Sequence, residues 1–183
     1  MAKTKITPKM LKQTKLIQKE VQRITEQNYK AIAKVFVDFG NDTEKQFAKI
    51  TMQDLKWDVL KSRLDIVLST NSKRSTKSFV NFLSKLFDFK LKTDRIEKVE
   101  NETVNQYAKG LAKKVTYVTE ATKNQIASLI DNNKGLNTND LAKLINEKFV
   151  EIGKGRAKTI ARTESASLFS KSNRSIADEV GLK

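Results

Sequence analysis

The stretch 17–39, which reads IQKEVQRITEQNYKAIAKVFVDF, decides the fold class of this chain of 183 residues. Its apolar residues recur at intervals of three and four, which places them on one face of an α-helix. We therefore expect a long amphipathic helix over residues 11–39, with Gly40 and Asn41 ending it. The apolar face consists of Ile17, Val21, Ile24, Ala31, Ile32, Val35, Phe36 and Phe39.

The helical pattern extends over the rest of the chain, which contains one proline and six glycines. A second apolar stripe lies between Trp57 and Leu68, and a third between Phe79 and Phe87, both with helical spacing. The sequence therefore predicts an all-α protein, in which an elongated helical arm is joined to a small helical bundle. Residues 114–118 are the exception. Val, Thr and Tyr favour strands, so one short β element is predicted there as the alternative to a helix.

Two changes in composition divide the chain into three parts. Residues 1–19 contain six lysines and no acidic residue, which predicts a flexible basic arm at the start of the chain, before the helix expected from residue 11. Ser, Thr, Asn and Lys dominate positions 69–75, a composition typical of a loop. We therefore expect a basic arm with long helices over residues 1–70, a helical middle segment over 71–114 and a C-terminal helical domain over 115–183.

Asparagine and glycine residues mark the expected helix ends in the last third. Asn137, followed three residues later by Asp140, is typical of a helix N-cap. Gly153 and Gly155 predict a break in the helix that starts there. A last helix is then expected over 156–180, and its N-terminus would present free backbone N–H groups to an anion.

The charge of the chain predicts a polyanionic partner. Lys and Arg number 36 against 21 Asp and Glu, which gives a formal charge of +15. Such an excess favours nucleic acid, a membrane surface or an acidic protein, although the solubility of lysine-rich helices is a plainer explanation. We expect the basic cluster of the last third to bind nucleic acid, through Lys154, Arg156, Lys158, Arg162, Lys171 and Arg174.

The residue patterns of common catalytic sites do not occur in this sequence. Cysteine and histidine are absent, which removes thiolate chemistry, the commonest zinc ligand and the commonest general base. There is no phosphate-binding glycine loop. We therefore expect no enzymatic activity, no catalytic residue, no metal site and no cofactor. Glu164 follows arginines in the sequence, and we interpret it as part of a structural ion pair or helix cap.

Two consecutive segments of the last third carry a specific pattern. Gly135-Leu136-Asn137 is followed by Asp140-Leu141-Ala142, and then by the run RAKTIARTE over residues 156–164. This pattern resembles the phage Mu F-like head morphogenesis proteins, also called minor head or minor capsid proteins, over residues 115–182. The resemblance implies a shared helical motif, whose residues here are Gly135, Asn137, Asp140, Ile160, Thr163 and Glu164.

The resemblance also implies a role and a set of partners. Members of this family are virion components that associate with the portal vertex and in some cases bind DNA. We therefore expect a minor head protein that binds the portal protein, other head proteins and double-stranded DNA without sequence preference. Its expected location is the phage head interior or portal vertex, and the host cytoplasm during assembly. Membrane contact is not expected, because no apolar run is long enough to span a bilayer.

A stand-alone basic helical nucleic-acid-binding protein is the alternative function. This alternative predicts tight DNA binding by the isolated chain that weakens steeply as salt rises, whereas the minor head protein is expected to co-purify with portal oligomers or procapsids. Many members of the resembled family continue beyond the shared motif. We therefore expect the chain to be either a short member or a fragment.

Overall fold

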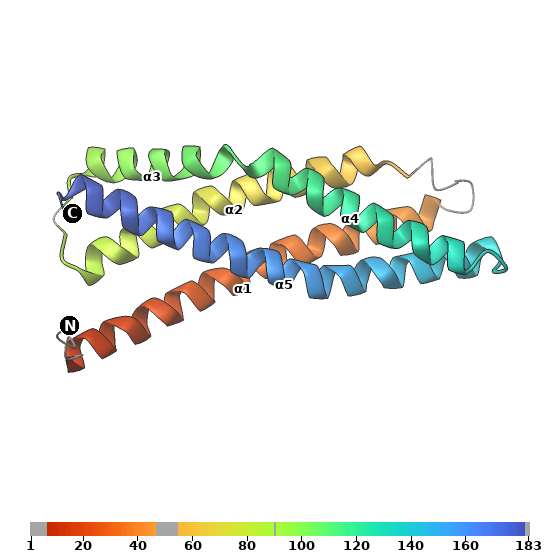
Figure 1. Cartoon of the computed structure of the whole chain (residues 1–183), viewed down its shortest axis with the longest axis horizontal. Coiled ribbons are helices and arrows are strands. Elements are labelled where there is room, and N and C mark those ends of the chain that lie inside the picture. Colours follow the sequence, from red (N-terminus) through yellow and green to blue (C-terminus); the bar gives the residue numbers. More distant parts are fainter. Residues whose placement is uncertain (1–6, 47–54, 90, 182–183) are drawn as a thin grey trace, which may run out of the picture.

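The computed structural model describes residues 7–46, 55–89 and 91–181, and these residues form five α-helices without a β-strand. This confirms the predicted all-α fold (Figure 1). The β element predicted as an alternative over residues 114–118 is wrong, because a helix is continuous there and buries Val115 and Val118. The helices are α1 (Pro8–Gln46), α2 (Trp57–Leu86), α3 (Thr93–Ala108), α4 (Leu111–Asn132) and α5 (Thr138–Glu179).

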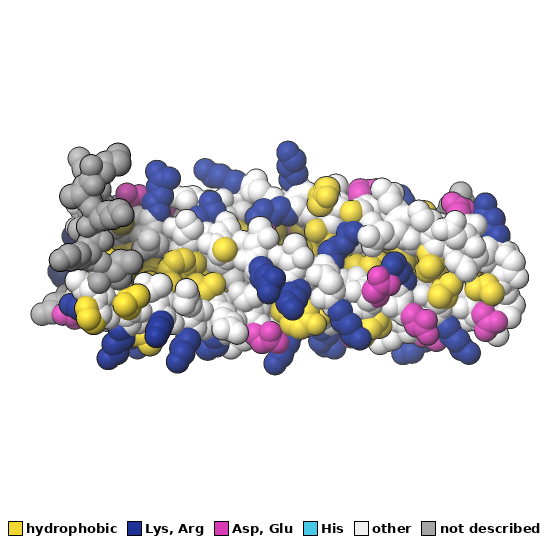
Figure 2. All heavy atoms as spheres, turned by 60° about the horizontal axis from the view of Figure 1, so that its bottom comes forward, with side chains coloured by type: hydrophobic (Ala, Val, Ile, Leu, Met, Phe, Trp, Pro, Cys, Tyr) yellow, Lys and Arg dark blue, Asp and Glu magenta, His cyan; other side chains and the backbone are white. Residues whose placement is uncertain are grey.

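The chain passes along one long axis four times in alternating directions, with α1, α2, the consecutive pair α3 and α4, and α5, as in an antiparallel helical bundle (Figure 1). α3 and α4 follow one another along the same side of the molecule, with a turn at Lys109 and Gly110 between them. α1 and α5 share the most extensive helix–helix contact, so α5 supports the first helix along much of its length. The start of α1 and the end of α5 lie at the same end of the bundle (Figure 1), and Lys and Arg side chains are spread along its surface (Figure 2).

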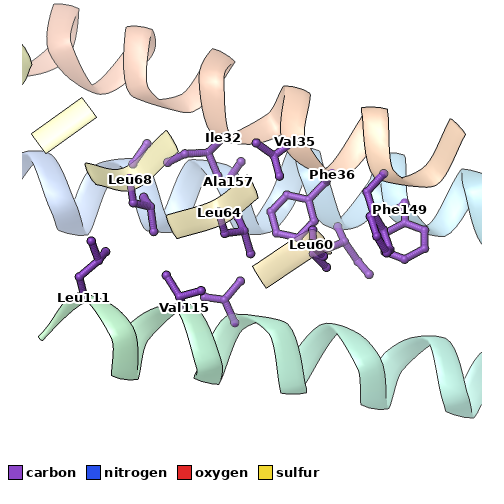
Figure 3. Close-up of a cluster of buried hydrophobic side chains, with 14 of the residues drawn as sticks. Ile32, Val35, Phe36, Leu60, Leu64, Leu68, Leu111, Val115, Phe149 and Ala157 are labelled. Carbon is purple, nitrogen blue, oxygen red and sulfur yellow. The ribbon is translucent and has the colours of Figure 1, made fainter. Parts of the chain in front are cut away.

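The core is a row of apolar side chains inside the bundle. Ile32 and Phe36 of α1, Leu64 of α2 and Phe149 of α5 are completely buried and lie within this row (Figure 3). Phe149 also packs edge to face against Phe39, with ring centroids 5.2 Å apart. Burial of one such side chain contributes about 1.5–3 kcal/mol. The apolar face predicted for residues 17–39 is therefore the face through which α1 joins the core.

Gly40 and Gly153 lie inside helices, where α1 and α5 approach each other closely. A Cβ atom at Gly40 would lie 2.8 Å from the Cβ of Phe149, and one at Gly153 would lie 3.2 Å from the Cβ of Phe36. The predicted helix ends at these glycines and at Gly155 are wrong, because α1 and α5 continue through them. The predicted anion site at a helix N-terminus after Gly155 does not exist, since α5 is one helix of 42 residues.

Residues 69–75 belong to α2, so the loop predicted there is wrong. Their polar composition has another cause, because Asn71, Ser72 and Ser75 are at most 5% exposed and line the interior. The Nδ2 of Asn28 in α1 donates hydrogen bonds to the Oγ of Ser75 and to the Oγ of Ser165 in α5, each at 3.1 Å. Hydrogen bonding offsets the cost of burying such polar groups. The division predicted at residue 70 therefore falls inside a helix, and the one predicted at residue 114 falls inside α4.

The N-terminal part of α1 extends away from the other helices (Figure 1). The helix expected over residues 11–39 begins earlier, at Pro8, so the flexible basic arm expected before it is wrong for residues 8–10, and residues 1–6 lie outside the described residues. Thr7 caps the helix through its Oγ1, which accepts a hydrogen bond from the Met10 N–H at 3.2 Å. Further along, the Oγ of Ser78 in α2 donates to the Glu20 carboxylate at 3.0 Å and ties the two helices together.

Candidate nucleic-acid interface

Three of the predicted DNA-binding residues form one exposed row on α5. Lys154, Lys158 and Arg162 are all exposed and lie at intervals of four residues. Successive members of such a row are about 6 Å apart along the helix axis, because an α-helix rises 1.5 Å per residue. The row exists only because α5 continues through Gly153 and Gly155; a break at either glycine would have moved Lys154 out of line.

The row borders a polar cleft between α5 and α1. The cleft has a volume of about 340 Å³ and is lined by Lys158 and Arg162 from α5 and by Gln22, Thr25, Glu26 and Tyr29 from α1. Lys and Arg side chains also stand out in the middle of the face that these two helices form (Figure 2). The guanidinium group of Arg and the amide, hydroxyl and phenol groups of the cleft can all donate hydrogen bonds to phosphate oxygens.

The cations of this row carry charge that the described part of the chain does not neutralise. None of the ion pairs formed by the described residues includes Lys154, Lys158 or Arg162. Glu26, the acid that lines the cleft, lies 3.9 Å from Lys30 of its own helix. Pairs of exposed residues at this distance contribute little. Glu26 therefore adds one negative charge beside the three cations, and the cleft and its row together keep a net positive charge for an external anion.

Arg156 does not belong to this exposed row, although the sequence analysis placed it in the nucleic-acid site. Its Nη1 donates hydrogen bonds to the carbonyl of Val118 at 3.3 Å and to the Oγ1 of Thr122 at 3.4 Å. Both acceptors belong to α4, and the Arg156 side chain is half-buried. Arg156 therefore joins α5 to α4. It lies apart from the exposed row, and its role as a DNA contact stays a prediction.

The other two predicted DNA-binding residues lie further along α5. Lys171 and Arg174 follow Arg162 by nine and twelve residues, which is about 14 and 18 Å along the helix. Neither lines the polar cleft. Arg174 is exposed and Lys171 is half-buried. The structure thus brings three of the six predicted residues together and leaves these two as separate surface cations.

Glu164 forms the structural ion pair that the sequence analysis expected, with a partner from another helix. Its carboxylate lies 2.9 Å from the Nζ of Lys114 in α4, and only 6% of the residue is exposed. The Lys114 ammonium also lies over the ring of Tyr107, 4.7 Å from its centroid. Burial, together with the adjacent negative charge of Glu164, raises the pKa of the Tyr107 hydroxyl far above its usual range. The hydroxyl therefore remains protonated, and the cluster holds α3, α4 and α5 together.

The remaining motif residues have structural positions. Asn137 caps α5, because its Oδ1 accepts a hydrogen bond from the Asp140 N–H at 3.0 Å, which confirms the predicted N-cap. Gly135 lies in the turn that precedes α5, and a Cβ atom there would meet no other atom within 4 Å. Ile160 packs against the core and Thr163 is exposed. These residues shape the helices and do not form a cleft.

The polar cleft contains residues that the sequence analysis missed. Gln22, Thr25 and Tyr29 follow one edge of the buried stripe of α1, at intervals of three and four. On the sequence alone, such a row cannot be distinguished from the solvated side of any amphipathic helix. Only the packing of α1 against α5 places it beside Lys158 and Arg162.

The described residues include no group of three or more Asp, Glu, His or Cys side chains that could hold a metal ion. Within the same residues, no helix combines the length and the apolar character needed to cross a membrane. Comparisons with protein-family models, with curated proteins and with solved structures find no match for this chain.

Proposed function

We propose that this chain is a minor head protein of a tailed phage, a structural virion component that associates with the portal vertex and contacts packaged double-stranded DNA. The observation that carries the DNA contact is the row of Lys154, Lys158 and Arg162 beside the polar cleft. The place in the head is supported by the resemblance of residues 115–182 to the Mu F-like head morphogenesis proteins. We propose no enzymatic role.

The geometry of the row favours contact with the phosphate backbone over reading of bases. Its three cations extend along about 12 Å of one straight helix, and Lys contacts phosphate as a point charge. The cations lie on the flank of a packed helix that is bordered by α1. Contacts to phosphate carry no sequence information. We therefore expect DNA binding of similar strength for unrelated sequences.

The DNA contact is tested by the salt dependence of binding to a duplex of arbitrary sequence. Each phosphate contact contributes about 0.9 to the slope of log affinity against log salt, so Lys158→Gln with Arg162→Gln should reduce the slope by about 2. The matched control replaces two exposed cations at the α3–α4 turn and in α4, Lys109→Gln with Lys113→Gln. An unchanged slope in the first variant, or an equal decrease in the control, would contradict the proposed contact.

The alternative, a stand-alone nucleic-acid-binding protein, shares this DNA contact and differs in location. Affinity that is equal for two unrelated duplexes counts against a sequence-specific regulator. Absence of the protein from purified heads, together with salt-sensitive DNA binding by the isolated chain, would favour the alternative.

A further inference from the structure

The first three turns of α1 carry an apolar stripe that continues beyond the bundle. Met10, Ile17, Val21 and Ile24 lie on one side of the helix, and the methyl-bearing but polar Thr14 lies between Met10 and Ile17. Within the bundle this row is buried, and Ile24 is 1% exposed. Met10 is 45% exposed, and Leu11 beside it is 51% exposed. The described part of the chain therefore leaves an apolar helical face uncovered where α1 extends away (Figure 1).

A second apolar surface lies at the same end of the molecule. Phe87 and Phe89 follow the end of α2, and together with Asn173, Ile176 and Ala177 of α5 they line a groove of about 250 Å³. Phe87 is 39% exposed, and its ring lies 5.7 Å from that of Phe89. Figure 2 shows hydrophobic side chains exposed along this end of the molecule, with Lys and Arg side chains beside them.

The charge of this part of α1 is entirely positive. Lys9, Lys12, Lys15 and Lys19 precede Glu20, the first acidic residue of the chain. None of the four takes part in an ion pair with another described residue. At about 100° per residue, Lys9 lies on one side of the apolar stripe and Lys15 on the other. A partner that covers the stripe would therefore meet cations along both of its edges.

We propose that this end of the bundle is a docking surface for an amphipathic helix of a partner protein whose polar face is acidic. Its residues are Met10, Leu11 and Ile17 of α1 with Phe87 and Phe89, and Lys9 and Lys15 lie along its edges. A helix fits because an apolar stripe recognises another apolar stripe with helical spacing. Acidic side chains beside that stripe would pair with the lysines, which gives selectivity for the partner.

Charge and shape distinguish this partner from two others. A second copy of this chain would bring the same four lysines and a further charge of +15, and like charges across an interface are unfavourable. A membrane surface needs no particular spacing of apolar residues, whereas the spacing of Met10, Ile17 and Val21 on one side of α1 matches that of a partner helix. The surface shares no residue with the α1–α5 cleft, so it goes beyond the proposed DNA contact.

The probe for this surface is a synthetic peptide of about four heptads, with Leu at the a and d positions and Glu at the e and g positions. Glutamates at all e and g positions suppress its self-association. The matched control peptide has Gln in place of these Glu residues. Binding to the full chain is measured by fluorescence anisotropy of the labelled peptide at two salt concentrations.

The Glu peptide should bind the wild-type chain more tightly than the Gln peptide, and less tightly at high salt. Met10→Ser with Leu11→Ser, and separately Lys9→Gln with Lys15→Gln, should each weaken binding by about tenfold or more, equivalent to 1.4 kcal/mol. These residues are exposed, so the variants should keep the helical content and melting behaviour of the wild type. The matched control replaces apolar residues that are exposed elsewhere, Ile66→Ser with Tyr117→Ser, and should bind normally.

Several results would overturn the proposal. One is equal binding of the two peptides, and another is an equal loss in the Ile66 and Tyr117 control. A wild-type dimer in sedimentation that Met10→Ser with Leu11→Ser abolishes would assign the surface to a second copy. Binding to phosphatidylserine vesicles that depends on Met10 and Leu11, without binding of the Glu peptide, would assign it to a membrane. The Lys158→Gln/Arg162→Gln variant should bind the peptide normally, so failure of the DNA contact and failure of this proposal are distinguishable.

Discussion

Replacement of Gly40 by Ala tests the close approach of α1 and α5 on which the whole bundle depends. Two opposing effects follow from the added methyl group. Alanine favours the helix over glycine by about 1 kcal/mol. The same methyl would lie 2.8 Å from the Cβ of Phe149 and 2.7 Å from the Oδ1 of Asn146. The Asn146 amide can move, but the Cβ of Phe149 is fixed to the backbone of α5, so the helices must separate.

Overpacking of this kind costs about 1–3 kcal/mol. Gly155→Ala supplies the matched control, because a Cβ atom there meets nothing within 4 Å. It should stabilise the protein by about 0.5–1 kcal/mol. Both variants gain the higher helix propensity of alanine, so the difference between their unfolding free energies gives the cost of overpacking at Gly40. We expect Gly40→Ala to be about 1–3 kcal/mol less stable than Gly155→Ala.

Urea denaturation followed by far-UV circular dichroism measures both free energies. In thermal melts, each kcal/mol corresponds to about 2–4 °C for a chain of this size. Equal stabilisation by the two alanines would refute the close approach of α1 and α5 at Gly40. A loss of helical content in Gly155→Ala would instead contradict the continuity of α5.

Three further predictions concern single interactions in the bundle. Lys114→Met leaves the buried Glu164 carboxylate without its partner and should lower the free energy of unfolding by about 3 kcal/mol. Glu164→Gln should lower it less, because the side chain of Lys114 is 40% exposed and regains water. A larger loss in Glu164→Gln than in Lys114→Met would contradict this reasoning. Asn137→Ala removes the cap of α5 and should lower the free energy of unfolding by about 1 kcal/mol, whereas Asn137→Asp should keep most of the stability. Equal unfolding free energies for the two variants would show that the side chain of residue 137 does not cap the helix. The Arg23 hydrogen bond, opposed by burial, holds the pKa of Glu20 below its usual 4.5. Its contribution to stability is therefore present above that pH and is lost as the pH falls through the folded-state pKa. Glu20→Gln should be less stable than the wild type at neutral pH, with the difference disappearing in acid; a difference that persists in acid would contradict this.

Helical periodicity was sufficient to predict the fold class and much of the core. Ile24, Ile32, Val35, Phe36 and Phe39 were expected on one face of a helix, and all five are buried. This success has a simple cause, because apolar spacing of three and four reports directly on which side of a helix meets other helices. The Asn137 cap was also predictable, since capping depends only on residues close in sequence.

The errors occurred where tertiary packing overrides local preference. Gly40 and Gly153 look like helix ends, but glycine is also the residue that lets two helices approach closely. Residues 69–75 look like a loop because they are polar, yet Asn71, Ser72 and Ser75 are buried in the interior, where Ser75 is hydrogen-bonded to Asn28 of α1. Neither the close contact at the glycines nor the burial of the polar residues can be recognised without knowing which helix packs against these positions.

In the candidate site, too, part could be predicted from the sequence and part depends on tertiary packing. The exposed cations of α5 were predicted from charge alone, but charge did not separate Lys158 and Arg162, which line a cleft, from Arg156, which is bonded to α4. Arg156 and Arg162 lie six residues apart on α5 and so point in different directions. The helix that lies opposite each of them decides its role.

The content of purified phage heads tests the central claim most directly. If the proposed function holds, the gene belongs to a tailed phage, and the measurement is quantitative mass spectrometry of purified heads of that phage, compared with the lysate from which they were purified. The account predicts that the protein is enriched in the heads, at a few copies for each portal. Its absence from heads in which the portal protein is readily detected would contradict the proposed function.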